Sequence, residues 1–95
     1  MKIWLDDIRE APNGYNWVLS VNKAKQLIID CENSGIAIDE LHLDHDLGDY
    51  ASDGGDAIEL VKWLAETERH YKIKIHSMNP VGRQNMQALI DRYLN

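Results

Sequence analysis

The sequence lacks most features that direct a protein to a membrane or an oxidising compartment. A single cysteine, Cys31, excludes an intramolecular disulfide. We expect a buried free thiol, because Cys31 stands at a position where apolar residues recur. No run approaches the roughly 20 apolar residues that span a bilayer, and the start MKIWLDD lacks the apolar segment of a signal peptide. We therefore expect a cytoplasmic protein without a membrane partner.

Positive charge is scarce as well. Sixteen acidic residues against ten basic ones give a formal net charge of −6, which repels long nucleic acids. The sequence contains no Pro-, Gly- or Ser-rich tract that would act as a linker, so residues 1–95 are expected to form one domain. The charge still permits a small anionic, phosphate-containing ligand if a metal supplies the positive charge.

Apolar runs and turn residues predict four strands, at residues 2–5, 17–19, 38–44 and 71–77. Helices are expected after three capping residues, from Ser20 to about Asn33, from Asp56 to about Arg69, and from Asn79 onwards. Glu59 follows Asp56 as in a capping box, and Pro80 takes the first position of the last helix. The last helix should bury Met86, Leu89, Ile90 and Tyr93.

This order of elements predicts right-handed crossovers and a mainly parallel, four-stranded sheet. We expect a small three-layer α/β sandwich, with one face thinly covered because only three helices are available. A homodimer would bury such a face. Three tryptophans are instead expected in the core: Trp4, Trp17 and Trp63.

Polar side chains follow three of the predicted strands. The carboxyl ends of parallel strands lie along one edge of the sheet, where ligands bind. Several carboxylates held close together require a counter-charge, and a divalent cation with oxygen ligands supplies it. We therefore predict a site at this edge from Asp6, Asp7, Asp44, His45, Asp46, His76, Ser77 and Asn79.

Taken singly, several of these residues have simpler roles. Asp6 and Asp7 alone would be a solvated strand end or a helix cap, and His76 alone would be a hydrogen-bonded surface or core histidine. His42 is expected to be a satisfied core or subsurface histidine rather than a ligand. The acids of the following Gly/Asp-rich loop are typical of turns and caps.

Two arginines point to phosphate. Asn79, Gly82 and Arg83 open a helix, where free N–H groups and a guanidinium can receive an anion. Arg9, two residues beyond Asp7, either adds a second cationic contact or forms a surface salt bridge.

The acidic pair Asp6 and Asp7, the strand-end Asp44 and the hydroxyl of Ser77 resemble the response-regulator receiver domain, a flavodoxin-like fold. The resemblance implies that the pair holds Mg²⁺, that Asp44 matches the phosphoryl-accepting aspartate, and that Ser77 contacts the phosphoryl group. The chain departs from the pattern in three places. The first helix and the fifth strand with its phosphate-binding lysine are missing, and His-Asp follows Asp44. The resemblance therefore implies a truncated receiver-like fold in which ordinary phosphorelay signalling is not expected.

A closer similarity is to receiver-like proteins predicted to process cyclic phosphates, small domains known largely from phages and bacteria. It is carried by WLDDIREAP (4–12), LDHDLG (43–48), the segment 54–64 that ends in KWL, and HSMNPVGRQNM (76–86). The resemblance implies a metal-dependent phosphoesterase that hydrolyses or opens a cyclic phosphate, in a cyclic nucleotide or at an RNA end.

Residue chemistry suggests a mechanism for such an enzyme. Asp6, Asp7 and Asp44 would hold Mg²⁺ or Mn²⁺, and Asp46 would ligate as well or orient a water. His45 or His76 would act as general acid, and the phosphate would be positioned by Ser77, Asn79, Arg83 and Arg9.

Two other functions fit the same residues. Asp44-His45-Asp46 also resembles the Asp-x-Asp motif of phosphomonoesterases with an aspartate nucleophile, although Leu47-Gly48 departs from the usual continuation. A non-catalytic receiver-like module that binds a nucleotide or a partner protein is the third reading. Its weakness is the pair His45 and His76, which a pure binder has little reason to place at a metal edge.

Overall fold

The computed structural model describes residues 1–94. The strands in this range are β1 (Lys2–Leu5), β2 (Tyr15–Val18), β3 (Glu40–Leu43) and β4 (Ile73–Ile75). The helices are α1 (Val21–Asn33), α2 (Ala57–Glu66) and α3 (Pro80–Leu89), with a 3-10 segment η1 (Gly48–Ser52) and a π-helical end η2 (Ile90–Leu94). The predicted strands are present but shorter or shifted by up to two residues.

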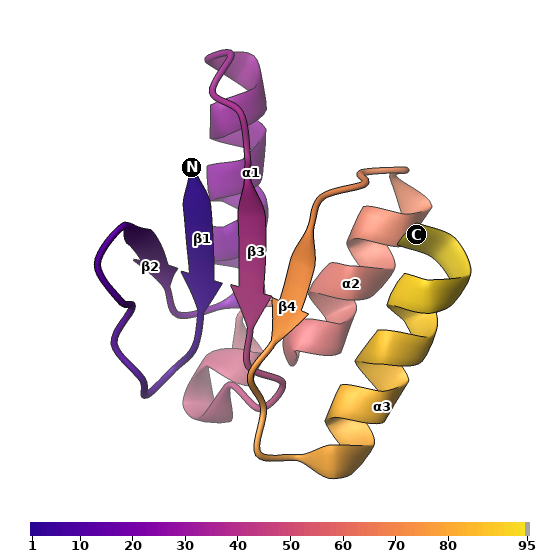
Figure 1. Cartoon of the computed structure of the whole chain (residues 1–95). Coiled ribbons are helices and arrows are strands. Elements are labelled where there is room, and N and C mark those ends of the chain that lie inside the picture. The colour runs from indigo at the N-terminus through magenta and orange to yellow at the C-terminus, as the bar shows by residue number, and fades with distance from the viewer. Residues whose placement is uncertain (95) are drawn as a thin grey trace.

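The sheet is parallel throughout, with the strand order β2-β1-β3-β4 (Figure 1). Trp4 of β1 is in register with Trp17 of β2 and His42 of β3. The α/β fold class with a four-stranded, mainly parallel sheet is therefore confirmed.

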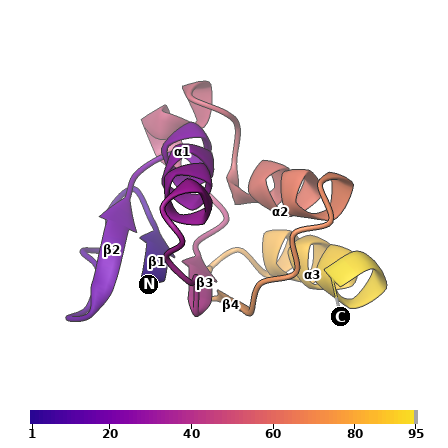
Figure 2. The ribbon, with the colours of Figure 1, turned by 90° about the horizontal axis from the view of Figure 1, so that it is seen from above.

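The structure lacks one of the three layers that the sequence predicted, because one face of the sheet has no helix over it in residues 1–94 (Figure 2). α1 and α2 lie on one side of the sheet, α3 lies beyond β4 against α2, and no helix of residues 1–94 covers the other side (Figure 2). Both helical crossovers, β2 to β3 and β3 to β4, run in the same direction across the sheet, so right-handed crossovers place both helices on one face. Only the β1–β2 connection runs the other way, and it contains no helix.

Alternation along the strands separates a covered face from an open one. Ile3, Leu5, Leu41 and Leu43 are fully buried beneath α1 and α2. The open face carries Trp4, His42 and Lys74. Trp63 is partly buried against the core, but the prediction for Trp17 was wrong, because it lies on an edge strand with 43% of its surface exposed.

Two of the three predicted caps are confirmed. The Ser20 side chain accepts from Lys23 N at 3.2 Å, and the Asn79 side chain accepts from Gly82 N at 3.0 Å. The predicted capping box at Asp56 is wrong, since its Oδ1 accepts instead from Leu47 N at 3.0 Å. That bond ties the loop after β3 to the start of α2.

The ends of two helices differ from expectation. α2 ends at Glu66 rather than near Arg69, and Glu68 has a positive φ of 55°. In η2 the wider π winding turns Leu94 inward, so Tyr93 is 49% exposed rather than buried as predicted. Cys31 is a buried free thiol as expected. No helix of residues 1–94 combines the length and apolarity that crossing a bilayer requires.

Candidate functional site

The sheet aligns the three polar strand ends beside one another. The parallel ladder continues one residue past each strand, with Asp6 N donating to Val18 O at 3.2 Å, Asp44 N to Leu5 O at 2.9 Å and His76 N to Leu43 O at 2.9 Å. Each bond fixes a polar residue against the neighbouring strand. Asp6, Asp44 and His76 therefore stand in a row along the carboxyl edge, as the sequence predicted.

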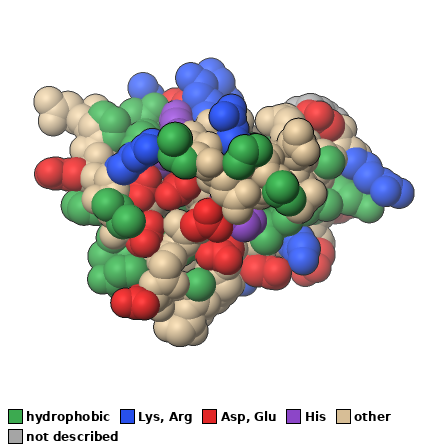
Figure 3. Space-filling view, turned by 90° about the horizontal axis from the view of Figure 1, so that it is seen from below, with side chains coloured by type: hydrophobic (Ala, Val, Ile, Leu, Met, Phe, Trp, Pro, Cys, Tyr) green, Lys and Arg blue, Asp and Glu red, His purple; other side chains and the backbone are tan. Residues whose placement is uncertain are grey.

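Three carboxylates meet at this edge. Asp6, Asp7 and Asp44 each offer an oxygen, and these atoms lie within 4.8 Å of one another. They open into a cavity of about 450 Å³ whose lining also includes Arg9, Asp46, Gly48 and Met78. Acidic side chains gather at the middle of this face in Figure 3. Arg9 is the only cationic lining residue in the described chain, so negative charge dominates the cavity.

Asp6 is fully buried and tightly held. Its Oδ1 accepts from the backbone N–H groups of Ile8 at 2.9 Å and Arg9 at 2.8 Å, and its Oδ2 contacts His76 Nε2 at 2.9 Å. Burial raises the pKa of Asp6, but the hydrogen bonds from Arg9, Ile8 and His76 outweigh it and lower the pKa. Asp6 is thus a fixed, ionised carboxylate.

Asp44 has the opposite balance. Burial and the adjacent charge of Asp6 raise the pKa of Asp44, and a hydrogen bond to Ser77 only partly offsets them. Asp46, which is exposed, has its pKa lowered mainly by a hydrogen bond from His45 Nδ1 at 2.9 Å. An added positive charge at the cluster would therefore favour the ionised form of Asp44.

Asp7 is positioned by a glycine that sequence reasoning missed. Gly48 has a φ of +54°, and a Cβ at this position would lie 2.6 Å from Asp7 Oδ2. A side chain at residue 48 would occupy the space of that carboxylate. The missing side chain therefore lets the loop after β3 pass directly beside the third acid.

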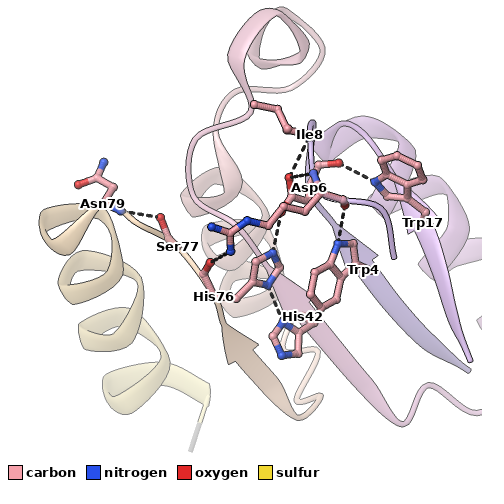
Figure 4. A network of polar contacts seen from close by, with 9 residues as sticks. Trp4, Asp6, Ile8, Trp17, His42, His76, Ser77 and Asn79 are labelled. Atoms are coloured by element: carbon pink, nitrogen blue, oxygen red, sulfur yellow. Dashed lines mark hydrogen bonds and ion pairs between the residues drawn. The ribbon is translucent and has the colours of Figure 1, made fainter. Parts of the chain in front are cut away.

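A stack of rings on the open face supports Asp6 from below (Figure 4). The His76 ring lies 4.0 Å from the Trp4 ring, centroid to centroid, and its Nδ1 contacts His42 Nδ1 while its Nε2 contacts Asp6. Burial and the nearby His76 lower the pKa of His42, which favours its neutral form. Two neutral rings can form both hydrogen bonds if His42 Nδ1–H donates to His76 Nδ1 and His76 Nε2–H donates to Asp6.

Both ring nitrogens of His76 are thus engaged, which suits a residue that positions Asp6. The expectation for His42 as a satisfied, partly buried histidine is confirmed. The sequence analysis did not link it to His76. The available signal was the period of two that places Trp4, His42 and Lys74 on one face.

Replacing His76 with phenylalanine should remove both hydrogen bonds and retain the stack on Trp4. The buried Asp6 carboxylate then loses its Oδ2 partner, and we expect a loss of about 2 kcal/mol in the free energy of unfolding. His76→Gln retains an N–H donor and should lose less. Urea unfolding at pH 7 measures both; a larger loss for His76→Gln would mean that stacking, not the hydrogen bond, is the main role of the ring.

The remaining predicted residues divide between the cavity and its surroundings. Ser77 is buried and bonded to Asp44, Asn79 Nδ2 donates to Asp46 at 3.3 Å, and Arg9 contacts the backbone oxygen of His76 at 3.5 Å. His45 does not line the acidic cavity, since its ring packs beneath Gly82, where an added Cβ would lie 2.5 Å from it. Arg83 lines a different cavity, between β4 and α3.

The fold and this edge define a receiver-like α/β domain with an acidic site at the carboxyl ends of its strands. The family model for the cyclic-phosphate processing receiver domain matches residues 1–92, and the chain belongs to that family. Comparisons with curated proteins and with solved structures gave no match.

Proposed function

We propose that this protein is a metal-dependent phosphoesterase that opens a cyclic phosphodiester to a phosphomonoester. The observation that supports it most is the cluster of Asp6, Asp7 and Asp44 oxygens within 4.8 Å in a strand-edge cavity. Membership in the cyclic-phosphate processing receiver family supports the substrate class.

The residues present fit a divalent cation. The cluster offers only carboxylate oxygens, the donors that Mg²⁺ and Mn²⁺ prefer. Burial and the adjacent charge of Asp6 raise the pKa of Asp44, and a bound cation would oppose both effects. Asp6, Asp7 and Asp44 would hold the ion, with Asp46 at the rim of the same cavity. When bound, such an ion neutralises developing charge on the phosphoryl oxygens and lowers the pKa of a water.

The chain's own residues have distinct tasks in this proposal. Arg9, Ser77 and Asn79 orient the phosphate, and Asp46, held by His45, orients the attacking water and accepts its proton. As the water oxygen bonds to phosphorus, the ring P–O bond breaks, and the released oxygen takes the proton. His76 acts through Asp6, because both of its ring nitrogens are already engaged.

The test is incubation with Mg²⁺, with Mn²⁺ or with EDTA, using 2′,3′-cyclic AMP, 3′,5′-cyclic AMP, cyclic di-AMP and p-nitrophenyl phosphate. Phosphorus NMR should show metal-dependent conversion of a cyclic ester to a monoester. Release of p-nitrophenol alone would favour the phosphomonoesterase alternative, with Asp44 as nucleophile. Turnover of no substrate, with a metal-induced rise in Tm, would instead indicate a non-catalytic binding module.

A further inference from the structure

A second cavity, of about 640 Å³, lies on the open side of the molecule between β4 and α3. Its polar lining comes from Lys74 of β4, His42 of β3, and Arg83, Gln84 and Gln87 of α3. Isoleucines of β4 and Pro80 add apolar surface. We call this cavity the β4–α3 groove. Its volume is within the range of small-molecule sites, and its mixture of apolar surface and a few convergent polar groups is typical of them.

The charge of the groove differs from that of the whole chain. Among residues 1–94, no carboxylate lines it, and the Arg83 guanidinium has no hydrogen-bond or ion-pair partner. Lys74 is paired with Glu40 at 3.2 Å, and Gln87 Nε2 donates to Asp91 at 2.8 Å. Arg83 is therefore an uncompensated cation in a protein of net charge −6. A guanidinium beside side-chain amides suits a phosphate group.

The groove adjoins the acidic cavity without being part of it. Met78 lines the acidic cavity and Pro80 lines the groove, so only the short loop between β4 and α3 separates the two. His42 in the groove is bonded to His76, which is bonded to Asp6 in the acidic cavity. A ligand at the acids can therefore extend over this loop and place its next group in the groove.

We infer that the β4–α3 groove binds a second phosphate group of the ligand, bound chiefly by Arg83. The inference rests on the proposed function for the reacting phosphate and narrows its substrate class. The preferred ligand carries two phosphates, of which one reacts at the acids and the other is held in the groove.

The first experiment needs no turnover. Inorganic pyrophosphate is titrated in EDTA while NMR follows the Arg83 Nε–H and the side-chain amides of Gln84 and Gln87. Saturable shifts at these three groups are expected, and Arg83→Gln should weaken binding at least about tenfold. Arg92→Gln is the matched control, since it removes the same charge outside the groove. Equal weakening by both variants, or no saturation, would overturn the inference.

The second experiment compares KM values in Mg²⁺. Arg83→Gln should raise the KM for cyclic di-AMP about tenfold and leave the KM for 3′,5′-cyclic AMP, which has one phosphate, within about twofold. An equal rise for both would place Arg83 at the reacting phosphate instead. If neither compound is turned over, the proposed function fails for these substrates, and the pyrophosphate titration still decides whether the groove binds phosphate.

Discussion

Replacing Asp44 with asparagine is expected to abolish metal-dependent turnover, with a loss of at least about 100-fold, because loss of even an outer partner of a metal ligand commonly costs 10- to 100-fold. The same change should remove most of the stabilisation by Mg²⁺, which for the unaltered protein is about 2.7 kcal/mol at 100 times Kd. Thermal unfolding with Mg²⁺ and with EDTA measures the second effect independently of any substrate.

Without metal, Asp44→Asn should make the protein more stable at neutral pH. The folded-state pKa of Asp44 is raised above its ordinary value of 3.8 by burial and by Asp6. A group with a raised folded pKa contributes stability at low pH that is lost as pH rises through that pKa. In EDTA, the stability advantage of Asp44→Asn should therefore grow as pH rises above 3.8, and urea unfolding between pH 4 and 7 measures it.

Asp49→Asn is the matched control for both effects. Asp49 is exposed in η1, does not line the acidic cavity, and loses the same charge. It should leave turnover, the response to Mg²⁺ and the pH profile unchanged. If Asp44→Asn behaves like this control, Asp44 has no part in a metal site.

Replacing Gly48 with alanine is expected to reduce metal affinity by about tenfold or more. Its Cβ would lie 2.6 Å from Asp7 Oδ2, so the Asp7 carboxylate must leave the position that it holds in the cluster with Asp6 and Asp44. The backbone at φ +54° adds a modest cost of about 1 kcal/mol in folding free energy. Calorimetric titration with Mn²⁺ measures the affinity.

Gly35→Ala is the control that separates the effect of backbone strain from the effect of displacing the Asp7 carboxylate. Gly35 has a similar φ of +70°, and an added Cβ meets no atom within 4 Å. It should lower stability by a similar amount and leave the Mn²⁺ affinity unchanged. Equal affinities for the two variants would show that Asp7 is not a ligand.

The fold class could be predicted because its signals are local. Apolar runs, the caps at Ser20 and Asn79, and the order of elements were sufficient for a parallel α/β sheet. The same topology rule then places Asp6, Asp44 and His76 on one edge, which the structure confirms. The local predictions that were wrong failed because contacts with other parts of the fold replaced the expected ones. Asp56 bonds Leu47 instead of capping its helix, and the π winding of η2 exchanges Tyr93 for Leu94.

Which side chains meet at the edge was decided by tertiary structure. Arg83 and His45 are close in sequence to site residues, but the rotation of α3 about its axis turns Arg83 into the β4–α3 groove and places Gly82 against the ring of His45, which lies in the loop after β3. The link between His42 and His76 joins residues 34 apart in the sequence. The sequence by itself determined the strands, their order along the chain and the acids at their ends, since periodicity and turn chemistry are properties of neighbouring residues. The bare sheet face, the groove and the partners of each ring follow from crossover direction and rotation about each helix, which only packing in three dimensions sets.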